Sequence, residues 1–254
     1  MEKTRNVHPR GALGALVVVG VLCLHVPSAR ADPADKVHLP TVVQGELEFE
    51  LNGGYQQGNL SVDDGERQLI YEVGYGLTSW WKSELGLGTV RLQGGSTHRD
   101  ELEWENTFAL TEPGEYWLDL GLFAELDHDY SGSGNSISIG PLLQKEVGAM
   151  QANLNLLFQR GLGSLAAEGT EFNYAWQLKW RGNPRFEPGV QGFGTLGSTG
   201  ELGHPFEHKL GPAVFSQVQV SDRNKLKADA ALLFGLNRNS PNTTVRFTLE
   251  FEIY

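Results

Sequence analysis

Carboxylates occupy every second position in several short segments of this chain. Glu46, Glu48 and Glu50 do so near its start, and Glu250 and Glu252 do so near its end. Because an extended strand turns alternate side chains to opposite faces, each run lines one face of a strand with charge. Such a face needs water or opposite charge beside it, since an unpaired charge in a dry interior is costly.

Basic residues follow the same alternation in other segments, mostly in the second half of the chain. The candidates for a shared charged lining are Glu48, Glu50, Glu72, Glu84, Glu103, Glu105, Asp119, Lys179, Arg181, Lys209, Lys225, Lys227, Arg246 and Glu250. Two interpretations stay open. The lining is either a salt-bridged, water-filled interior that only stabilises the protein, or a pair of opposed acidic and basic walls that orient a solute in transit.

Catalytic and metal chemistry find weaker support in the sequence. Ser216 and His208 lie on one expected strand but eight residues apart, and no nucleophile elbow, phosphate loop or His/Cys metal motif is present. His98 and the stretches "DHD" (127–129) and "HPFEH" (204–208) fall on expected loops beside carboxylates, a mixture that can bind divalent metals. Nothing fixes a ligand geometry there, so we predict no catalytic residue, no metal site and no cofactor.

The first 31 residues have the layout of a secretory signal peptide. Basic residues precede an apolar run from Ala12 to Leu24, and "PSARA" offers a cleavage site after Ala31. The only cysteine, Cys23, belongs to this stretch. We therefore expect Sec-type export, a short periplasmic segment over residues 32–41, and a single folded unit over residues 42–254.

The charge of the mature chain excludes one class of partner. Removing residues 1–31 takes away four of the 20 Lys/Arg and one of the 31 Asp/Glu, which leaves a net charge of −14. Nucleic acid is a poor partner for such a chain, because phosphate binding needs a cationic surface. No apolar run in the mature chain reaches the length of a spanning helix.

Period-two alternation of apolar and polar residues recurs twelve times after residue 42, and no helical period competes over a comparable length. The expected strands are Val43–Tyr55, Gln68–Leu77, Trp81–Val90, Glu101–Leu110, Tyr116–Leu126, Ser136–Glu146, Met150–Gln159, Glu171–Arg181, Arg185–Thr195, His208–Val220, Asn224–Leu236 and Thr243–Tyr254. In Glu171–Arg181 the pattern is clearest, with aromatic and aliphatic residues on one face and polar residues on the other.

The connections between these segments alternate between short turns and longer loops rich in Gly, Ser and Asp. Aromatic residues gather near the expected strand ends, namely Trp80, Trp81, Tyr116, Trp180 and Tyr254. These features favour an all-β, transmembrane, antiparallel up-and-down β-barrel of about 12 strands over a soluble periplasmic sandwich or a lipocalin-like barrel. In a closed barrel the first and last strands pair, so "GELEFEL" (45–51) and "TLEFEIY" (248–254) are expected to meet.

Several stretches resemble a known family: "YEVGYGLTSWWKSELGLG" (71–88), "GPLLQKEVG" (140–148), "GPAVFSQV" (211–218) and the closing "FGLNRNSPNTTVRFTLEFEIY". They look like the outer-membrane transporters grouped under the meta-pathway of phenol degradation. The resemblance covers nearly all of the mature chain. It implies a bacterial outer-membrane barrel that passes small molecules, without establishing that this chain handles phenols.

We therefore expect a monomeric barrel in the outer membrane of a Gram-negative bacterium. Its expected function is the passive passage of a small solute through a charged lumen, and the alternative is a non-conducting structural or surface-binding barrel. The expected partners are outer-membrane lipids, the barrel-assembly machinery and periplasmic chaperones during biogenesis, and the solute. No plug domain of the kind that couples transport to energy is expected between Ala31 and the first strand.

Overall fold

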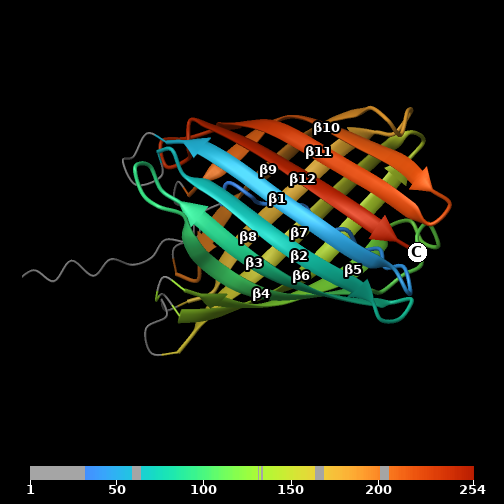
Figure 1. The fold of residues 1–254 in the computed structure, drawn as a ribbon, viewed down its shortest axis with the longest axis horizontal. Helices are drawn as coiled ribbons and strands as arrows, with labels where there is room; N and C mark the ends of the chain where they lie inside the picture. The colour runs from blue at the N-terminus through green and yellow to red at the C-terminus, as the bar shows by residue number, and fades with distance from the viewer. Residues whose placement is uncertain (1–31, 59–63, 131, 133, 164–168, 201–205) are drawn as a thin grey trace, which may run out of the picture.

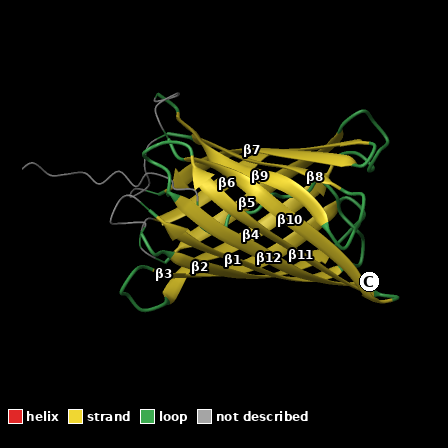
Figure 2. Cartoon of the chain, turned by 90° about the horizontal axis from the view of Figure 1, so that it is seen from above, coloured by secondary structure: helices red, strands yellow, loops and turns green. Residues whose placement is uncertain are grey.

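The computed structural model describes residues 32–58, 64–130, 132, 134–163, 169–200 and 206–254, so the expected signal peptide lies outside the described residues. The described residues form strands β1 Leu47–Gln57, β2 Arg67–Gly76, β3 Trp81–Arg91, β4 His98–Ala109, β5 Asp119–Asp129, β6 Gly134–Val147, β7 Met150–Leu162, β8 Glu171–Trp180, β9 Glu187–Ser198, β10 His208–Ser221, β11 Asn224–Gly235 and β12 Thr243–Ile253. Every strand pairs antiparallel with its sequence neighbours, and β1 pairs with β12 to close the barrel (Figure 1). Among the described residues, no helix is long and apolar enough to cross a membrane (Figure 2).

The seam of the barrel joins the two segments that the sequence pairs. Glu48 lies opposite Glu252, Phe49 opposite Phe251 and Glu50 opposite Glu250. This register keeps phenylalanines together on one face and glutamates together on the other, as strands with a period of two require. The predicted fold, a closed antiparallel barrel of twelve strands, is confirmed.

Burial in this barrel is the reverse of burial in a soluble protein. Polar side chains fill the inside: Gln68 is 2% exposed and Arg246 is 1% exposed. Large apolar side chains stand on the outside, where Leu85 is 60% exposed and Tyr71 is 51% exposed. This arrangement is that of a membrane barrel, whose outer face meets hydrocarbon and whose inner face meets water or other polar groups.

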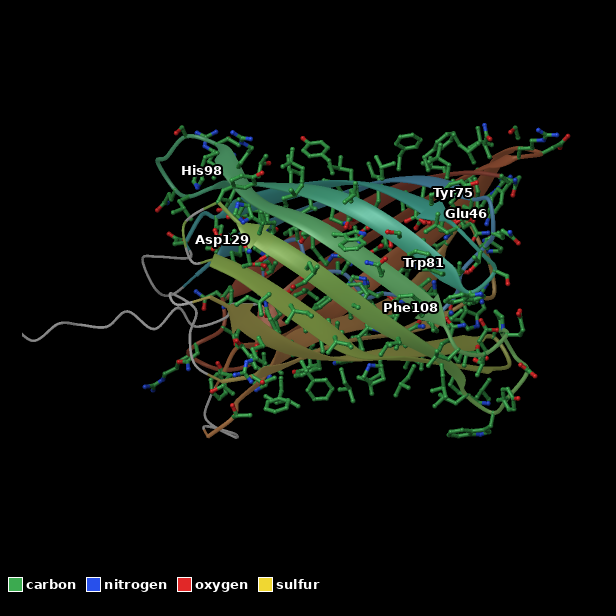
Figure 3. All side chains as sticks on the ribbon, turned by 90° about the horizontal axis from the view of Figure 1, so that it is seen from below. Glu46, Tyr75, Trp81, His98, Phe108 and Asp129 are labelled. Carbon is green, nitrogen blue, oxygen red and sulfur yellow. The ribbon has the colours of Figure 1, made fainter. Side chains whose placement is uncertain are left out.

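Aromatic side chains gather at the rim that carries the short turns. Trp80, Trp81 and Phe108 stack with ring centroids 6.2 to 6.4 Å apart, and Figure 3 shows Trp81 and Phe108 at the rim opposite His98 and Asp129. Tyr254 is expected to belong to this aromatic girdle, but its side chain is oriented differently. Its hydroxyl turns to the interior, where it lies 2.5 Å from the carboxylate of Glu252.

Three strands start later than the sequence pattern suggests: the ninth begins at Glu187 rather than Arg185, and the fifth and first are shifted further. The fifth strand begins at Asp119 rather than Tyr116, because side chains hold the preceding turn: the Asp119 carboxylate accepts a hydrogen bond from the Gly114 amide at 2.7 Å, and Thr111 Oγ1 accepts one from the Leu120 amide at 2.9 Å. The first strand begins at Leu47 rather than Val43. Residues 43–46, which the sequence pattern places at the start of this strand, instead belong to a segment that runs inside the barrel.

Candidate functional site in the barrel lumen

The predicted lining residues lie on the inner face of the barrel, around two cavities. The lower chamber, near the short-turn rim, has a volume of about 460 Å³, and the upper chamber, toward the long-loop rim, has a volume of about 170 Å³. The candidates that line the lower chamber are Glu48, Glu50, Glu84, Lys179, Arg181, Lys225, Lys227, Arg246 and Glu250. Those that line the upper chamber are Glu72, Glu103 and Glu105.

The other two candidates are buried in separate contacts. Asp119 is 6% exposed and accepts hydrogen bonds from the Gly114 amide and the Gln144 side chain. Lys209 is 1% exposed, and its Nζ donates to the Asp32 carbonyl at 2.8 Å and lies 3.2 Å from the Asp35 carboxylate. Lys209 therefore anchors the start of the described chain.

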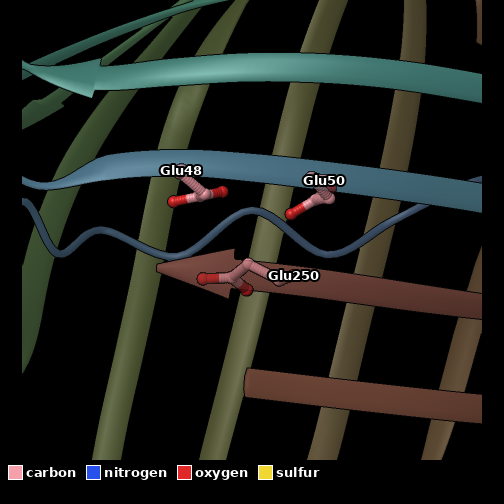
Figure 4. Close-up of side chains that lie close together, drawn as sticks. All are labelled: Glu48, Glu50 and Glu250. Atoms are coloured by element: carbon pink, nitrogen blue, oxygen red, sulfur yellow. The ribbon is translucent and has the colours of Figure 1, made fainter. Parts of the chain in front are cut away.

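Most charges around the lower chamber are paired with a neighbour. Three carboxylates, Glu48, Glu50 and Glu250, offer oxygens that all lie within 4.8 Å of one another (Figure 4). A different lysine lies beside each of them: Lys82 is 3.3 Å from Glu48, Lys36 is 3.3 Å from Glu50, and Lys227 is 2.8 Å from Glu250. Such pairing compensates the repulsion among the carboxylates.

Further pairs complete this lower network. Lys225 lies 2.8 Å from Glu252, and Arg246 lies 2.7 Å from Asp229. Lys179 lies 3.6 Å from Glu187. Each of these pairs joins adjacent strands, so the lower half of the lumen is a salt-bridged lining with both signs of charge.

Neutral amides form the part of the inner wall contributed by β6 to β9. Asn153 donates to Gln144 at 2.9 Å, Gln177 donates to Asn153 at 3.1 Å, and Gln191 donates to Gln177 at 3.2 Å. Arg246 continues the chain with a 2.8 Å hydrogen bond to Gln191. This hydrogen-bonded row of amides is therefore polar but uncharged, and it ends at the basic side chain of Arg246.

The N-terminal segment occupies the lumen, which corrects the prediction that residues 32–41 lie in the periplasm. Residues 32–46, the lumenal segment, run inside the barrel from the upper chamber to the short-turn rim, and Figure 4 shows the segment as a dark blue coil. Its path is fixed by hydrogen bonds along its length. The Ala34 amide donates to Gln68 at 3.3 Å, the His38 amide donates to Asn155 at 2.8 Å, and the Gly45 amide donates to the Gly76 carbonyl at 2.8 Å.

Lys36 and His38 form the barrier between the two chambers, because both residues line both cavities. The Lys36 ammonium lies 2.6 Å from Glu72, 3.2 Å from Glu105 and 3.3 Å from Glu50. The His38 ring packs against Phe123 in a tilted arrangement with centroids 4.0 Å apart. An internal lysine and an internal histidine thus block the middle of the lumen.

Glycines on the inner face make room for the lumenal segment. A Cβ on Gly54 would lie 1.8 Å from the Pro33 carbonyl oxygen, and a Cβ on Gly76 would lie 1.9 Å from the Val43 carbonyl oxygen. Both distances are far below a van der Waals contact, so only glycine fits while the segment is seated. These two glycines serve close backbone approach and not only the curvature of the sheet.

The sequence pattern did not reveal the roles of Lys36 and His38. Both residues lie in a segment without period-two alternation, and their partners come from strands that are distant in sequence. The available signal was indirect: inward-facing glycines on neighbouring strands leave space that some other part of the chain has to fill. The amide wall was more visible, since Gln151, Asn153 and Asn155 alternate in the seventh strand.

At the short-turn rim the last residue closes the lining. Burial raises the pKa of the Glu46 carboxyl, and the nearby Glu252 carboxylate raises it further. Burial also raises the pKa of the Tyr254 hydroxyl, and hydrogen bonds with Glu252 and Glu46 add to this effect. The Tyr254 hydroxyl therefore keeps its proton at neutral pH and remains a hydrogen-bond donor.

Comparison with solved structures places this barrel among outer-membrane barrels. The NanC porin matches with a TM-score of 0.55 and 10% identity over 81% of this chain and 99% of that one. An outer membrane channel from Pseudomonas putida F1 matches with a TM-score of 0.52 and 15% identity over 88% of this chain and 99% of that one. The KdgM porin, in complex with disordered oligogalacturonate, matches with a TM-score of 0.51 and 8% identity over 82% of this chain and 98% of that one. No protein-family model and no curated protein matches the chain.

At identities this low, the matches show a shared fold. The chain folds as an outer-membrane-type β-barrel, and it spans nearly the whole length of each of these three structures. The charged lumen and its internal segment are features that we describe from this chain alone.

Proposed function

We propose that this chain is a passive outer-membrane channel of a Gram-negative bacterium that carries a small polar or charged solute through its lumen. The observation that supports the proposal most is the interior of the closed barrel, in which charged side chains surround two cavities. A purely structural barrel could instead be filled with packed side chains. Such a lining is costly in a dry interior and therefore favours water in the lumen. Two of the similar structures are named porins and a third is named an outer membrane channel, which supports the same class of function.

The lumenal segment defines the resting state of the proposed channel. Lys36 and His38 separate the chambers, so a solute passes when the segment shifts or leaves. The segment also favours the second candidate function, a non-conducting structural or surface-binding barrel, because it fills the middle of the lumen. The proposal also includes membership of the group of transporters of the phenol meta-pathway and a monomeric state. It further includes assembly with the help of the barrel-assembly machinery and periplasmic chaperones.

Ion selectivity in planar bilayers tests the proposed function. Residues 32–254, refolded in detergent and added to the bilayer, should give discrete current steps. Glu103→Gln should lower the permeability ratio of K⁺ to Cl⁻ by about twofold, because it removes a lumenal carboxylate whose Oε2 has no hydrogen-bond partner among the described residues. Lys227→Met should raise that ratio, because it removes the lysine beside Glu250 and one of the two lysines beside Glu252.

The exposed Glu112 offers a matched control on a short turn, and Glu112→Gln should leave the ratio unchanged. Bilayers that stay silent with the wild-type protein and with variants that dislodge the lumenal segment would contradict the channel and favour the structural barrel.

A further inference from the structure

The upper chamber holds an acidic cluster that differs from the one in the lower chamber. Glu72, Glu103 and Glu105 are all buried, and their carboxylate oxygens lie within 4.8 Å of one another. Of the described residues that line this chamber, Lys36 is the one Lys or Arg. It is shared between Glu72 and Glu105 here and Glu50 below, whereas Glu48 and Glu250 of the lower cluster lie beside two further lysines, Lys82 and Lys227.

Strand register extends this cluster into two rows of acids that climb around the barrel wall. In one row, Glu250, Glu50, Glu72, Gly86, Glu103 and Asp127 follow one another from β12 to β5. In the other row, the order is Glu252, Glu48, Gly74, Glu84, Glu105 and Glu125. Like charges directly opposite one another destabilise a sheet, so both rows need cations along their length.

Among the described residues, lysines form ion pairs with the acids in the lower parts of these rows but not with those at the upper ends. Lysines contact Glu250, Glu252, Glu48, Glu84, Glu50, Glu72 and Glu105. At the upper end, Glu103 is only 9% exposed, and its Oε2 accepts no hydrogen bond from any described residue. Asp127, opposite Glu103 on β5, likewise has an Oδ1 without a hydrogen-bond partner among the described residues.

The sheet also leaves space for the Glu103 carboxylate to enter the chamber. Its cross-strand neighbour is Gly86, and a Cβ at that position would lie 2.5 Å from Glu103 Oε2. A buried carboxylate whose Oε2 has no hydrogen-bond partner among the described residues thus lies beside a cavity of about 170 Å³. This is the arrangement of a site that lacks its positive partner, because burying such a group without one costs several kcal/mol.

Lys36 shows which kind of cation these carboxylates accept. Its primary ammonium lies among Glu50, Glu72 and Glu105 at 2.6 to 3.3 Å, with hydrogen bonds to both oxygens of Glu72. We propose that the upper chamber binds a small organic cation through a primary ammonium group, held by Glu103 with Glu125 and Asp127 beside the position of Lys36. The inference names the solute class of the proposed channel and therefore rests on the proposed function.

Calorimetric titration in detergent tests the site without requiring any current. The mature protein at low salt is titrated with 1,4-diaminobutane, with neutral 1,4-butanediol as the matched control ligand and Ca²⁺ as a separate ligand. We expect the diamine to bind and the diol not to bind. Glu103→Gln/Glu125→Gln should weaken diamine binding by about tenfold or more, because it removes two carboxylates from the site.

A matched variant controls for the change in net charge. Glu112→Gln/Glu115→Gln removes two exposed carboxylates on a short turn and should leave diamine binding unchanged. Lys36→Met should strengthen diamine binding by about tenfold, because it removes the resident ammonium from three carboxylates.

Equal diamine affinity in the wild type and in Glu103→Gln/Glu125→Gln would overturn the inference. Binding of Ca²⁺ without binding of the diamine would also overturn it, in favour of a divalent metal. Conductance in bilayers without diamine binding would refute this site and leave the channel standing, whereas diamine binding with silent bilayers would refute the channel and support the site.

Discussion

Replacing Lys36 by glutamate is expected to raise the single-channel conductance of the barrel about fivefold or more, because the lumenal segment should leave its position. The wild-type ammonium holds the segment through Glu50, Glu72 and Glu105. A glutamate at position 36 would bring a fourth carboxylate among these three, and buried like charges repel strongly. The strands themselves do not change, so the current steps should grow while the barrel stays folded.

Two controls separate displacement of the segment from loss of the fold. Lys36→Arg keeps the positive charge and should keep the conductance close to that of the wild type. Gly54→Leu should raise the conductance by an independent route, because its Cβ would meet the Pro33 backbone. Gly53→Leu on the outer face is the comparison variant, because the atoms nearest to its Cβ belong to the side chains of Phe247 and Leu69. Wild-type conductance in both Lys36→Glu and Gly54→Leu would show that the segment does not limit the current.

Truncating Asp229 to alanine is expected to reduce the free energy of unfolding by about 3 kcal/mol or more, which is over a hundredfold in the folding equilibrium. Asp229 pairs with Arg246 at 2.7 Å, and the Arg246 side chain is only 1% exposed. Gln191 and Thr248 also accept hydrogen bonds from this guanidinium but carry no charge. Without Asp229 the guanidinium is left buried and without its ion-pair partner.

Unfolding by guanidinium chloride in detergent micelles, followed by tryptophan fluorescence, measures this change in the free energy of unfolding. The double variant Asp229→Leu/Arg246→Met is the matched control, because replacing both partners by apolar groups removes the unpaired charge as well as the pair. It should regain most of the lost stability. A cost below about 1 kcal/mol for Asp229→Ala would mean that water or another group solvates Arg246 as well as Asp229 does.

The fold of this protein is largely predictable from local sequence because a barrel repeats one simple rule. Each lipid-spanning strand alternates apolar and polar residues, so strands such as Asn224–Gly235 and Thr243–Ile253 are predicted to within one residue of their ends. Closure follows from the same physics, since an open edge in lipid would leave unpaired backbone groups. The two strands that start latest relative to the pattern, at Leu47 and Asp119, do so where turn and lumenal contacts replace the ladder.

The arrangement inside the lumen is much less predictable. Alternation assigns Glu72 and Glu103 to the inner face, but it does not say that Gly86 alone separates them across the sheet. That juxtaposition depends on the stagger of neighbouring strands, which is a property of the closed barrel as a whole. Lys36 is harder still, because its partners Glu50, Glu72 and Glu105 lie on three different strands.

The most direct test of the account is whether adjacent residues of β3 face water and lipid in turn. Cys23, the only cysteine, lies within the first 31 residues, so the mature chain accepts single cysteines without background. Glu84 is 3% exposed and lines the lower chamber, whereas Leu85 is 60% exposed on the outer face. In lipid vesicles with a charged, membrane-impermeant thiol reagent on both sides, Glu84→Cys should be labelled, and Leu85→Cys should stay unlabelled until the protein is unfolded. Labelling of Leu85→Cys with protection of Glu84→Cys would contradict a lipid-facing outer wall and a water-filled lumen.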